Sequence, residues 1–377
     1  MKVNQLFIFI LLFIWACEAE VPIDSPVQEP RDPFEVEGFL SARRLSNYVI
    51  SERLIYLGIE DRDLGNSIQV FDTESENLTQ TIRLTPSYFK FLGKHQNHLY
   101  SFGKISFSNG EERATIIQMD LQGQKFAEFS SDNSCLPEGY RFSHEDGQLV
   151  DEAGNIWLYL WNSVNATAGP HLGLLRFQPA SNTCTYWDEN NSNIPGNIIR
   201  DFKPYQDKLY LSSRYAHDSL YNLSRFDQGT FTTIGKADFD FPIIKGIQTD
   251  VNGLLYYVET DLYTQQMRRA DGSLIDPGLD EDYTQENLSY WKDNEQNEFV
   301  FGTASVQLRY SNYDPYPHFF PYFSKNGETL VDWLSEFQPF KDVITGDMYQ
   351  FPGETDEIWL VGPNPVDGVV IKLRFNE

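Results

Sequence analysis

The most regular feature of the sequence is a pair made of an aliphatic and an aromatic residue, set inside a short, mostly apolar run. Successive pairs lie about 50 residues apart, and self-similarity at a period of this size is typical of repeat architectures. The pairs are Ile55-Tyr56, Leu99-Tyr100, Ile156-Trp157, Leu209-Tyr210, Leu255-Tyr256 and Ile358-Trp359, with Phe299-Val300 as a weaker member.

Turn-forming residues accompany these pairs. The clearest turn before a pair runs from Asp151 to Asn155, and a hairpin follows each pair, as in the segment that turns at Asn326-Gly327. Asp, Asn and Gly accept the backbone angles of tight hairpins. Each unit is therefore predicted to hold about four short strands: an inner strand, the strand with the pair, and the hairpin. The body shows no convincing helical period.

Units of this kind, repeated about seven times, predict an all-β fold, a single β-propeller over residues 34–377. Seven four-stranded blades fit the spacing best; six or eight blades, or two sandwiches of tandem hairpins, are the alternatives. The last unit ends with Val369–Phe375 and lacks a fourth strand, whereas Phe34–Leu40 is a spare strand near the start. We expect this N-terminal strand to close the last blade, because an unpaired edge invites pairing with other chains.

Residues 1–16 have the features of a signal peptide. An apolar run of twelve residues ends at Cys17. This run is shorter than the roughly 20 residues that a membrane span needs. Its end, Ile14-Trp15-Ala16-Cys17, resembles the lipobox of bacterial lipoproteins, with Trp15 in place of a small residue. The resemblance implies a lipid on Cys17 and a place in the bacterial outer membrane or periplasm. The alternative is cleavage without lipid, which gives a soluble secreted protein.

Charge and composition narrow the choice of partners. Residues 17–33 are rich in proline and carboxylates, which indicates an extended, solvated tether. Aromatic residues make up 15% of the chain, so a packed core is expected. The net charge is −26, and a surface this acidic repels phosphates, so we expect no nucleic-acid partner.

The sequence holds no recognised catalytic motif. HExxH, GxSxG, GxxxxGK[ST] and GxGxxG are missing, and the six His are scattered over different units. We therefore assign no catalytic residue and no cofactor. A divalent cation such as calcium is a weaker alternative at two acidic loops, 61–66 and 276–282. In the first loop Gly and Asn stand in the reverse of the calcium-loop order, and both loops read as solvated.

Two cysteines, Cys135 and Cys184, remain once Cys17 is assigned to the lipid. In an exported protein, two such cysteines suggest a disulfide. The strand map argues against a simple bond, because it places the two residues at opposite faces of the ring. The loop 130–142 is long enough to reach across, so the sequence does not decide whether the disulfide forms.

A ligand is expected on the face formed by the loops between the second and third strands of each unit, together with the connections between units. Loops on a rigid scaffold favour binding, and aromatic residues beside cations suit a sugar, a peptide or an anionic group. The candidates are Lys104, Trp161, His171, Arg214, Tyr215, His217, Arg309, Tyr310 and Tyr313.

Cys17, the acidic tether and the aromatic-rich repeats together resemble the β-propeller lipoproteins of Bacteroidota, and the stretch 151–157 is similar to repeats of their periplasmic sensor propellers. The resemblance implies a fold rather than a function. We expect a monomeric, non-enzymatic binding or protein-interaction module at the cell envelope, with an envelope protein, a peptide or a carbohydrate as partner. The alternatives are a lyase or lactonase with a divalent metal at the ring axis, and a structural subunit of an envelope complex.

Overall fold

The structure is a computed structural model, and all of its described elements are strands. No helix in the described part of the chain is long and apolar enough to cross a membrane. The signal peptide and the tether predicted for residues 1–33 lie outside the described residues. Those residues are 34–42, 45–61, 65–84, 88–106, 112–130, 134–136, 140–142, 149–162, 173–188, 190–196, 198–205, 208–214, 222–236, 243–249, 254–259, 265–269, 272–275, 283–292, 297–306, 319–331, 347–349, 357–362 and 368–375.

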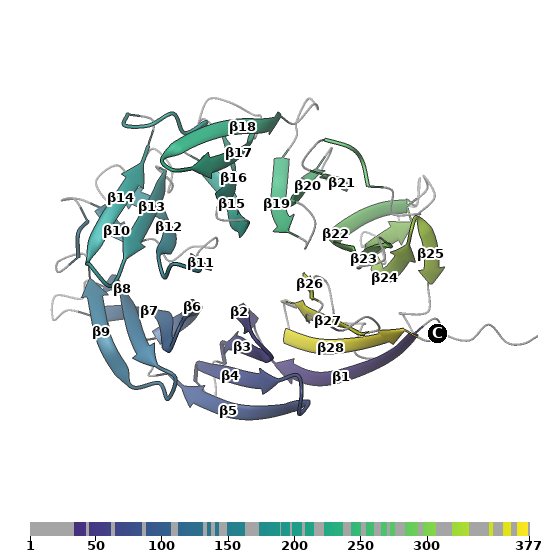
Figure 1. The fold of residues 1–377 in the computed structure, drawn as a ribbon, viewed down its shortest axis with the longest axis horizontal. Coiled ribbons are helices and arrows are strands. Elements are labelled where there is room, and N and C mark those ends of the chain that lie inside the picture. The colour runs from purple at the N-terminus through teal and green to yellow at the C-terminus, as the bar shows by residue number, and fades with distance from the viewer. Residues whose placement is uncertain are drawn as a thin grey trace, which may run out of the picture.

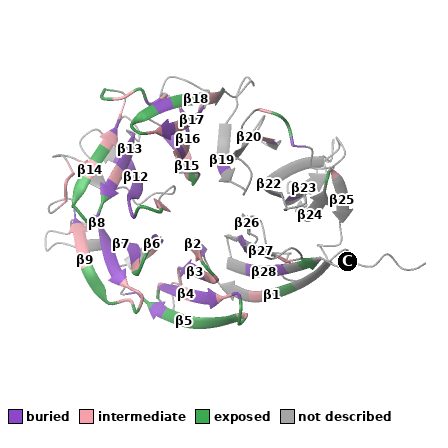
Figure 2. Ribbon diagram, in the orientation of Figure 1, coloured by how far each residue is buried: buried purple, intermediate pink, exposed green. Residues whose placement is uncertain are grey.

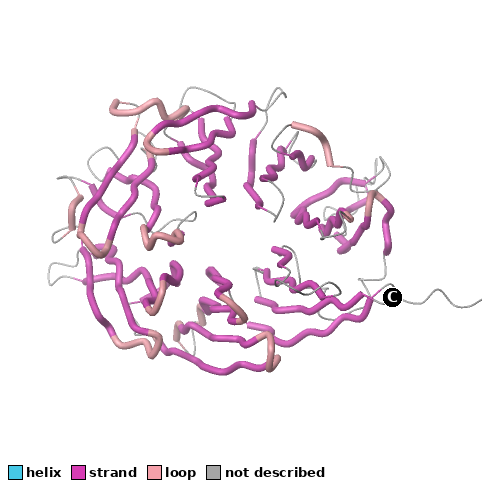
Figure 3. The backbone as a smooth tube through the Cα atoms, viewed as in Figure 1, coloured by secondary structure: helices cyan, strands magenta, loops and turns pink. Residues whose placement is uncertain are grey.

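The described strands form seven antiparallel sheets, which stand side by side around a ring (Figure 1 and Figure 3). The first sheet holds β2 (Leu45–Ser51), β3 (Leu54–Ile59), β4 (Ser67–Asp72) and β5 (Asn77–Arg83), and the second holds β6 (Tyr88–His95), β7 (His98–Ser106), β8 (Glu112–Asp120) and β9 (Lys125–Ser130). The third holds β10 (Tyr140–Phe142), β11 (Leu149–Val150), β12 (Ile156–Asn162), β13 (Leu174–Gln178) and β14 (Thr183–Trp187), and the fourth holds β15 (Ile198–Tyr205), β16 (Lys208–Arg214), β17 (Asn222–Asp227) and β18 (Thr230–Lys236).

The ring continues through three further sheets. The fifth holds β19 (Ile243–Thr249), β20 (Leu254–Glu259) and β21 (Gln265–Arg269), and the sixth holds β22 (Tyr283–Lys292), β23 (Glu298–Val306), β24 (Phe319–Lys325) and β25 (Glu328–Val331). The seventh holds β26 (Asp347–Tyr349), β27 (Glu357–Gly362), β28 (Gly368–Phe375) and, from the other end of the chain, β1 (Phe34–Ala42). This arrangement is a β-propeller, as the repeat predicts.

Each aliphatic–aromatic pair lies on the second strand of its sheet, as predicted. Successive side chains on a strand point to opposite faces, so the two members of a pair serve two different interfaces. Ile55 packs in the core between the seventh and first sheets, and Tyr56 packs in the core between the first and second. In the third sheet, Ile156 packs in the core shared with the second sheet, and Trp157 packs in the core shared with the fourth. The pair recurs in these sheets because each of them has two covered faces.

Burial follows from this geometry. In the first sheet β3 and β4 are mostly buried, whereas six of the seven residues of β5, on the outside of the ring, are exposed (Figure 2). Successive side chains of the middle strands therefore point alternately into two apolar cores, and not alternately into a core and into solvent. This explains why these strands read as nearly continuous apolar runs.

The N-terminal strand closes the ring. β1 pairs antiparallel with β28 from Phe34↔Phe375 to Ala42↔Gly368. The strand predicted at Phe34–Leu40 therefore completes the seventh sheet, and it covers the edge that β28 would otherwise expose. Phe39 of this strand packs against Phe71 and Trp359, with ring centroids 5.6 and 5.5 Å apart, so closure also joins the seventh sheet to the first.

A buried lysine strengthens the same junction. The Lys372 ammonium group on β28 lies 5.6 Å from the centre of the Trp359 ring and 3.0 Å from the Glu357 carboxylate of its own sheet. It also donates a hydrogen bond to Glu76, which belongs to the turn between β4 and β5 of the first sheet. Arg374 pairs with Glu357 at 2.6 Å. The contact of Lys372 with Glu76 therefore bridges the seventh sheet and the first, whereas the two ion pairs of Glu357 lie within the seventh sheet.

Cys135 and Cys184 form a disulfide, with Cα atoms 5.3 Å apart. The inference that they lie at opposite faces of the ring is wrong. Cys135 lies in the segment that follows β9, and this segment reaches the outer strand β14 of the next sheet, where Cys184 pairs with Phe177. The bond clamps the second sheet to the third at the outside of the ring. Closing a loop of this length, 49 residues in sequence, stabilises a fold by about 4 kcal/mol in the chain-entropy model.

Glu357→Gln is expected to make the protein less sensitive to acid. Burial by itself raises the pKa of the Glu357 carboxyl, but hydrogen bonds from Arg374 and Lys372 outweigh it, and the pKa is lowered in the fold. The ion pairs therefore stabilise the fold fully above the unfolded pKa, which is about 4.3, and this stability is lost as pH falls through the folded pKa. Urea denaturation at a series of pH values measures the effect.

The wild-type free energy of unfolding should fall more steeply below about pH 5 than that of Glu357→Gln. Glu128→Gln is the matched control, because Glu128 pairs with Lys125 at the surface, where an ion pair contributes at most about 1 kcal/mol. Equal slopes for Glu357→Gln and the wild type would contradict the prediction.

Candidate functional site

A groove opens between the third and fourth sheets, with a volume of about 1090 Å³. It lies where β12 and β16 begin and where the hairpin of β17 and β18 turns, so it belongs to one face of the ring. We call it the interblade groove. Its lining residues are Val150, Asp151, Glu152, Ala153, Asn155, Trp157, Arg176, Thr185, Trp187, Pro204, Lys208, Leu209, Phe226, Asp227, Gln228 and Gly229.

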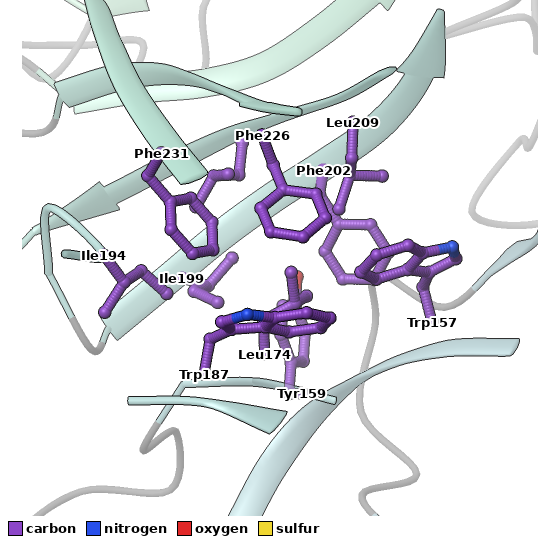
Figure 4. Packing of buried hydrophobic residues seen from close by; sticks show 11 residues of the cluster. Trp157, Tyr159, Leu174, Trp187, Ile194, Ile199, Phe202, Leu209, Phe226 and Phe231 are labelled. Carbon is purple, nitrogen blue, oxygen red and sulfur yellow. The ribbon is translucent and has the colours of Figure 1, made fainter. Parts of the chain in front are cut away.

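The floor of the groove is aromatic. Figure 4 shows how its aromatic side chains pack together. Trp157 of β12 and Trp187 of β14 stack with ring centroids 5.7 Å apart and planes 17° apart. Phe226 of β17 packs with its edge toward both rings, at 5.6 and 4.7 Å. All three side chains are at most 8% exposed, so they form the core of the junction and the groove lies above them.

A single guanidinium covers the two tryptophans. The Arg176 Cζ on β13 lies 5.7 Å from the centre of the Trp157 ring and 5.5 Å from that of Trp187. Stacking of this kind leaves the edges of the guanidinium available for hydrogen bonds. Within the described residues its one hydrogen bond is from Nη2 to the Thr185 hydroxyl at 3.4 Å, and its buried Nε has no partner.

The turn before β12 forms one wall, and its motif has a physical explanation. The Asp151 carboxylate accepts hydrogen bonds from the backbone N–H groups of Ala153 and Asn155, at 3.0 and 2.8 Å. It also accepts hydrogen bonds from the Asn155 side chain and from the Trp157 indole N–H, both at 2.8 Å. Gly154 has a φ of +78°, which favours glycine. The stretch 151–157 therefore fixes the orientation of Trp157.

The opposite wall carries one loose ion pair. Lys208 at the start of β16 lies 3.5 Å from Asp227 at the end of β17, and both side chains are more than a third exposed. Gln228 and Gly229, the tip of the same hairpin, complete the rim. The groove therefore combines acidic, basic and amide groups above an apolar floor, which is a composition that suits a polar ligand or a peptide.

The groove and the sequence-predicted ligand face lie at opposite ends of the strands. β16 begins with Lys208 at the groove and ends with the candidate Arg214, about 20 Å away at the usual rise per residue. Arg214 is half-buried. Lys104 and Trp161 lie on β7 and β12, but their side chains are outside the description, as are His171, Tyr215, His217, Arg309, Tyr310 and Tyr313 altogether. The loop-face prediction therefore stays a prediction.

Sequence reasoning missed the groove. The turn 151–155 and Trp157 were visible as a motif, but Arg176 stands in the middle of a strand with no local sign of a site. Only the register, which sets Trp157 opposite Arg176, brings them together. A search for cations at that cross-strand position would have found it.

The described part of the chain contains no group of three His, Cys, Asp or Glu residues that could hold a metal ion. In the calcium-like loop 61–66 the structure describes Asp61, Gly65 and Asn66, and the Gly65 N–H donates to the Asp61 carbonyl at 3.0 Å. The rest of that loop and the acidic run 276–282 lie outside the described residues.

Comparison with known proteins indicates the fold alone. No protein-family model matches the chain, and no curated protein matches it significantly. The chain is similar to the Niastella koreensis GH74 enzyme with a TM-score of 0.52 at 13% identity, over 90% of this chain and 53% of that one, so it spans about half the length of that enzyme.

Two further solved structures are similar at lower scores. The β-propeller domain of Myceliophteria thermophila Cps50 (Swd1) has a TM-score of 0.49 at 10% identity, over 90% of this chain and 99% of that one. The extracellular domain of a B. thetaiotaomicron protein described as a one-component system has a TM-score of 0.43 at 13% identity, over 90% of this chain and 40% of that one.

Asp151→Ala is expected to destabilise the protein by about 2–4 kcal/mol, because hydrogen bonds to a charged group contribute about 1.5–3 kcal/mol and several are lost at once. The tryptophan fluorescence should also shift to the red, because Trp157 loses its partner. Glu152→Ala, in the same turn but exposed, should change stability by at most about 0.5 kcal/mol. Urea denaturation followed by fluorescence measures both, and equal effects of the two substitutions would argue against the role of Asp151.

Proposed function

We propose that this protein is an exported, seven-bladed β-propeller, anchored by a lipid on Cys17, that works as a non-enzymatic binding module at the cell envelope. The observation that carries the proposal is the interblade groove, in which a cation, carboxylates and amides surround an open space between two rigid sheets. Concave surfaces that combine an apolar floor with a few polar groups are typical of binding sites.

One observation supports export. The Cys135–Cys184 bond is of a type that persists in oxidising compartments.

The position of β1 suggests which face of the ring lies toward the membrane. Phe34 pairs with Phe375, the last residue of β28, and so lies at the end of the strands where β27 begins. In the third and fourth sheets the corresponding strands, β12 and β16, begin at the groove. A tether joined at Phe34 would therefore leave the ring on the groove side, and 17 extended residues reach about 50 Å. The partner would then be found close to the membrane.

The anchor is tested by intact mass and detergent partitioning of the native protein beside a Cys17→Ser variant. The expected result is acylated Cys17 in the detergent phase, with the variant in the aqueous phase, because acyl chains anchor by burying methylenes. Cleavage without a lipid in the native protein would overturn the anchor and leave a secreted module.

The binding role is tested by photo-crosslinking in intact cells that produce the protein. A photoreactive residue at Gln228, an exposed position on the rim of the groove, should give one discrete adduct. The same residue at Phe126, which is 72% exposed on β9 and outside the groove, is the matched control and should give none. Equal labelling from both positions, or none from Gln228, would refute the groove as the binding surface.

A further inference from the structure

We propose that the interblade groove holds a carboxylate group on Arg176, and that this group is an acidic side chain of a partner polypeptide. The inference deepens the proposed function and rests on it. It comes from comparing two junctions of the same ring, one of which supplies the carboxylate from its own chain.

A cation stands opposite the aromatic member of the pair in four of the sheets. The cross-strand partners are Trp157↔Arg176, Tyr210↔Arg225, Tyr256↔Arg268 and Trp359↔Lys372. In the third and seventh sheets the structure places the cation over the ring, at 5.7 and 5.6 Å from its centre. Arg176 and Lys372 therefore occupy the same place in two different junctions.

At the junction of the seventh and first sheets, the cation is held by carboxylates. Lys372 contacts Glu357 of its own sheet and Glu76 from the turn between the third and fourth strands of the next sheet. A carboxylate from the neighbouring hairpin turn thus fits above a cation that is stacked on an aromatic ring. This junction shows the chemistry that the position accepts.

At the junction of the third and fourth sheets, the internal carboxylate is missing among the described residues. The corresponding turn, between β17 and β18, is Gln228-Gly229, and Gly229 has a φ of +91°. A Cβ built on Gly229 would meet no atom within 4 Å, so the space beyond this turn is open. Arg176 keeps only its long bond to Thr185 in the described structure. The groove is the place from which a carboxylate would approach it.

The other acidic residues of the groove do not take this role. Asp151 is occupied by the four hydrogen-bond donors of its own turn, and Asp227 pairs with Lys208. Glu152 is exposed in the turn that holds Asp151. A planar carboxylate matches the guanidinium fork, which makes it a better partner for Arg176 than a neutral group.

Two observations favour an acidic side chain of a polypeptide over other anions. Sugars with acid groups bind in part by stacking on a bare aromatic face, but Trp157 and Trp187 are covered by each other, by Phe226 and by Arg176. A dense polyanion would be repelled by the net charge of −26, whereas a single carboxylate meets little of that repulsion.

The test uses two short peptides with blocked termini, one with a single central Glu and one with Gln in its place. The full-length protein is titrated with each, and binding is followed by tryptophan fluorescence and by calorimetry. Because a hydrogen bond to a charged group contributes about 1.5–3 kcal/mol, the Glu peptide should bind about tenfold or more tightly than the Gln peptide. Arg176→Gln should remove this preference, and Arg176→Lys should restore part of it.

Arg225→Gln is the matched control. Arg225 holds the same place in the fourth sheet and also has a buried Nε without a hydrogen-bond partner, but it does not line the groove. This variant should keep the preference for Glu within about twofold, a difference of about 0.4 kcal/mol. Thermal unfolding of each variant shows that loss of binding is not loss of fold.

Equal binding of the two peptides, or no saturable binding of the Glu peptide, would overturn the inference. So would a uronate-rich polysaccharide that binds through Arg176 while the peptide does not. The proposed function fails separately: crosslinking from Gln228 with no Glu preference would mean a different ligand for the same groove, whereas no crosslinking at all would mean that the groove is not the binding surface.

Discussion

Every sheet of this ring needs a neighbour on both faces, and the rest of the structure depends on that constraint. In the first three sheets the aliphatic member of the pair packs toward the preceding sheet and the aromatic member toward the next, as Ile55 and Tyr56 do. Burying one such side chain contributes about 1.5–3 kcal/mol, and an open end would leave a whole face without this gain. The ring is therefore stable only when it is closed, and the pairing of β1 with β28 closes it.

The cation that stacks on the aromatic ring has different surroundings at two junctions of the ring. Where the seventh sheet meets the first, the stacked cation is neutralised inside the protein by Glu76 and Glu357. Where the third meets the fourth, the stacked cation Arg176 faces a groove. The same position in the sheet thus holds a neutralised cation at one junction and a cation facing a groove at the other. The two junctions differ in the hairpin turn of the next sheet and in the residue two positions before the aromatic ring, which is Glu357 in one and Asn155 in the other.

The sequence predicted what depends on local pattern. The position of each pair on the second strand, the turn at 151–155 and the closing strand at Phe34–Leu40 follow from periodicity, turn chemistry and an unmatched strand. It did not predict what depends on neighbours in space. The path from β9 to Cys184 and the open space beyond Gly229 are set by how one sheet packs on the next, which no spacing encodes. The loop-face candidates, drawn from the other ends of the strands, fall mainly outside the described residues.

The pairing of Phe34 with Phe375 also governs the order in which the protein can fold. β1 is made before every other described strand, whereas its partner β28 is made after all of them. Until then β1 is an unpaired strand next to a growing apolar chain, and contacts so distant in sequence form slowly. The molecule therefore passes through a period in which its first strand is open to wrong partners.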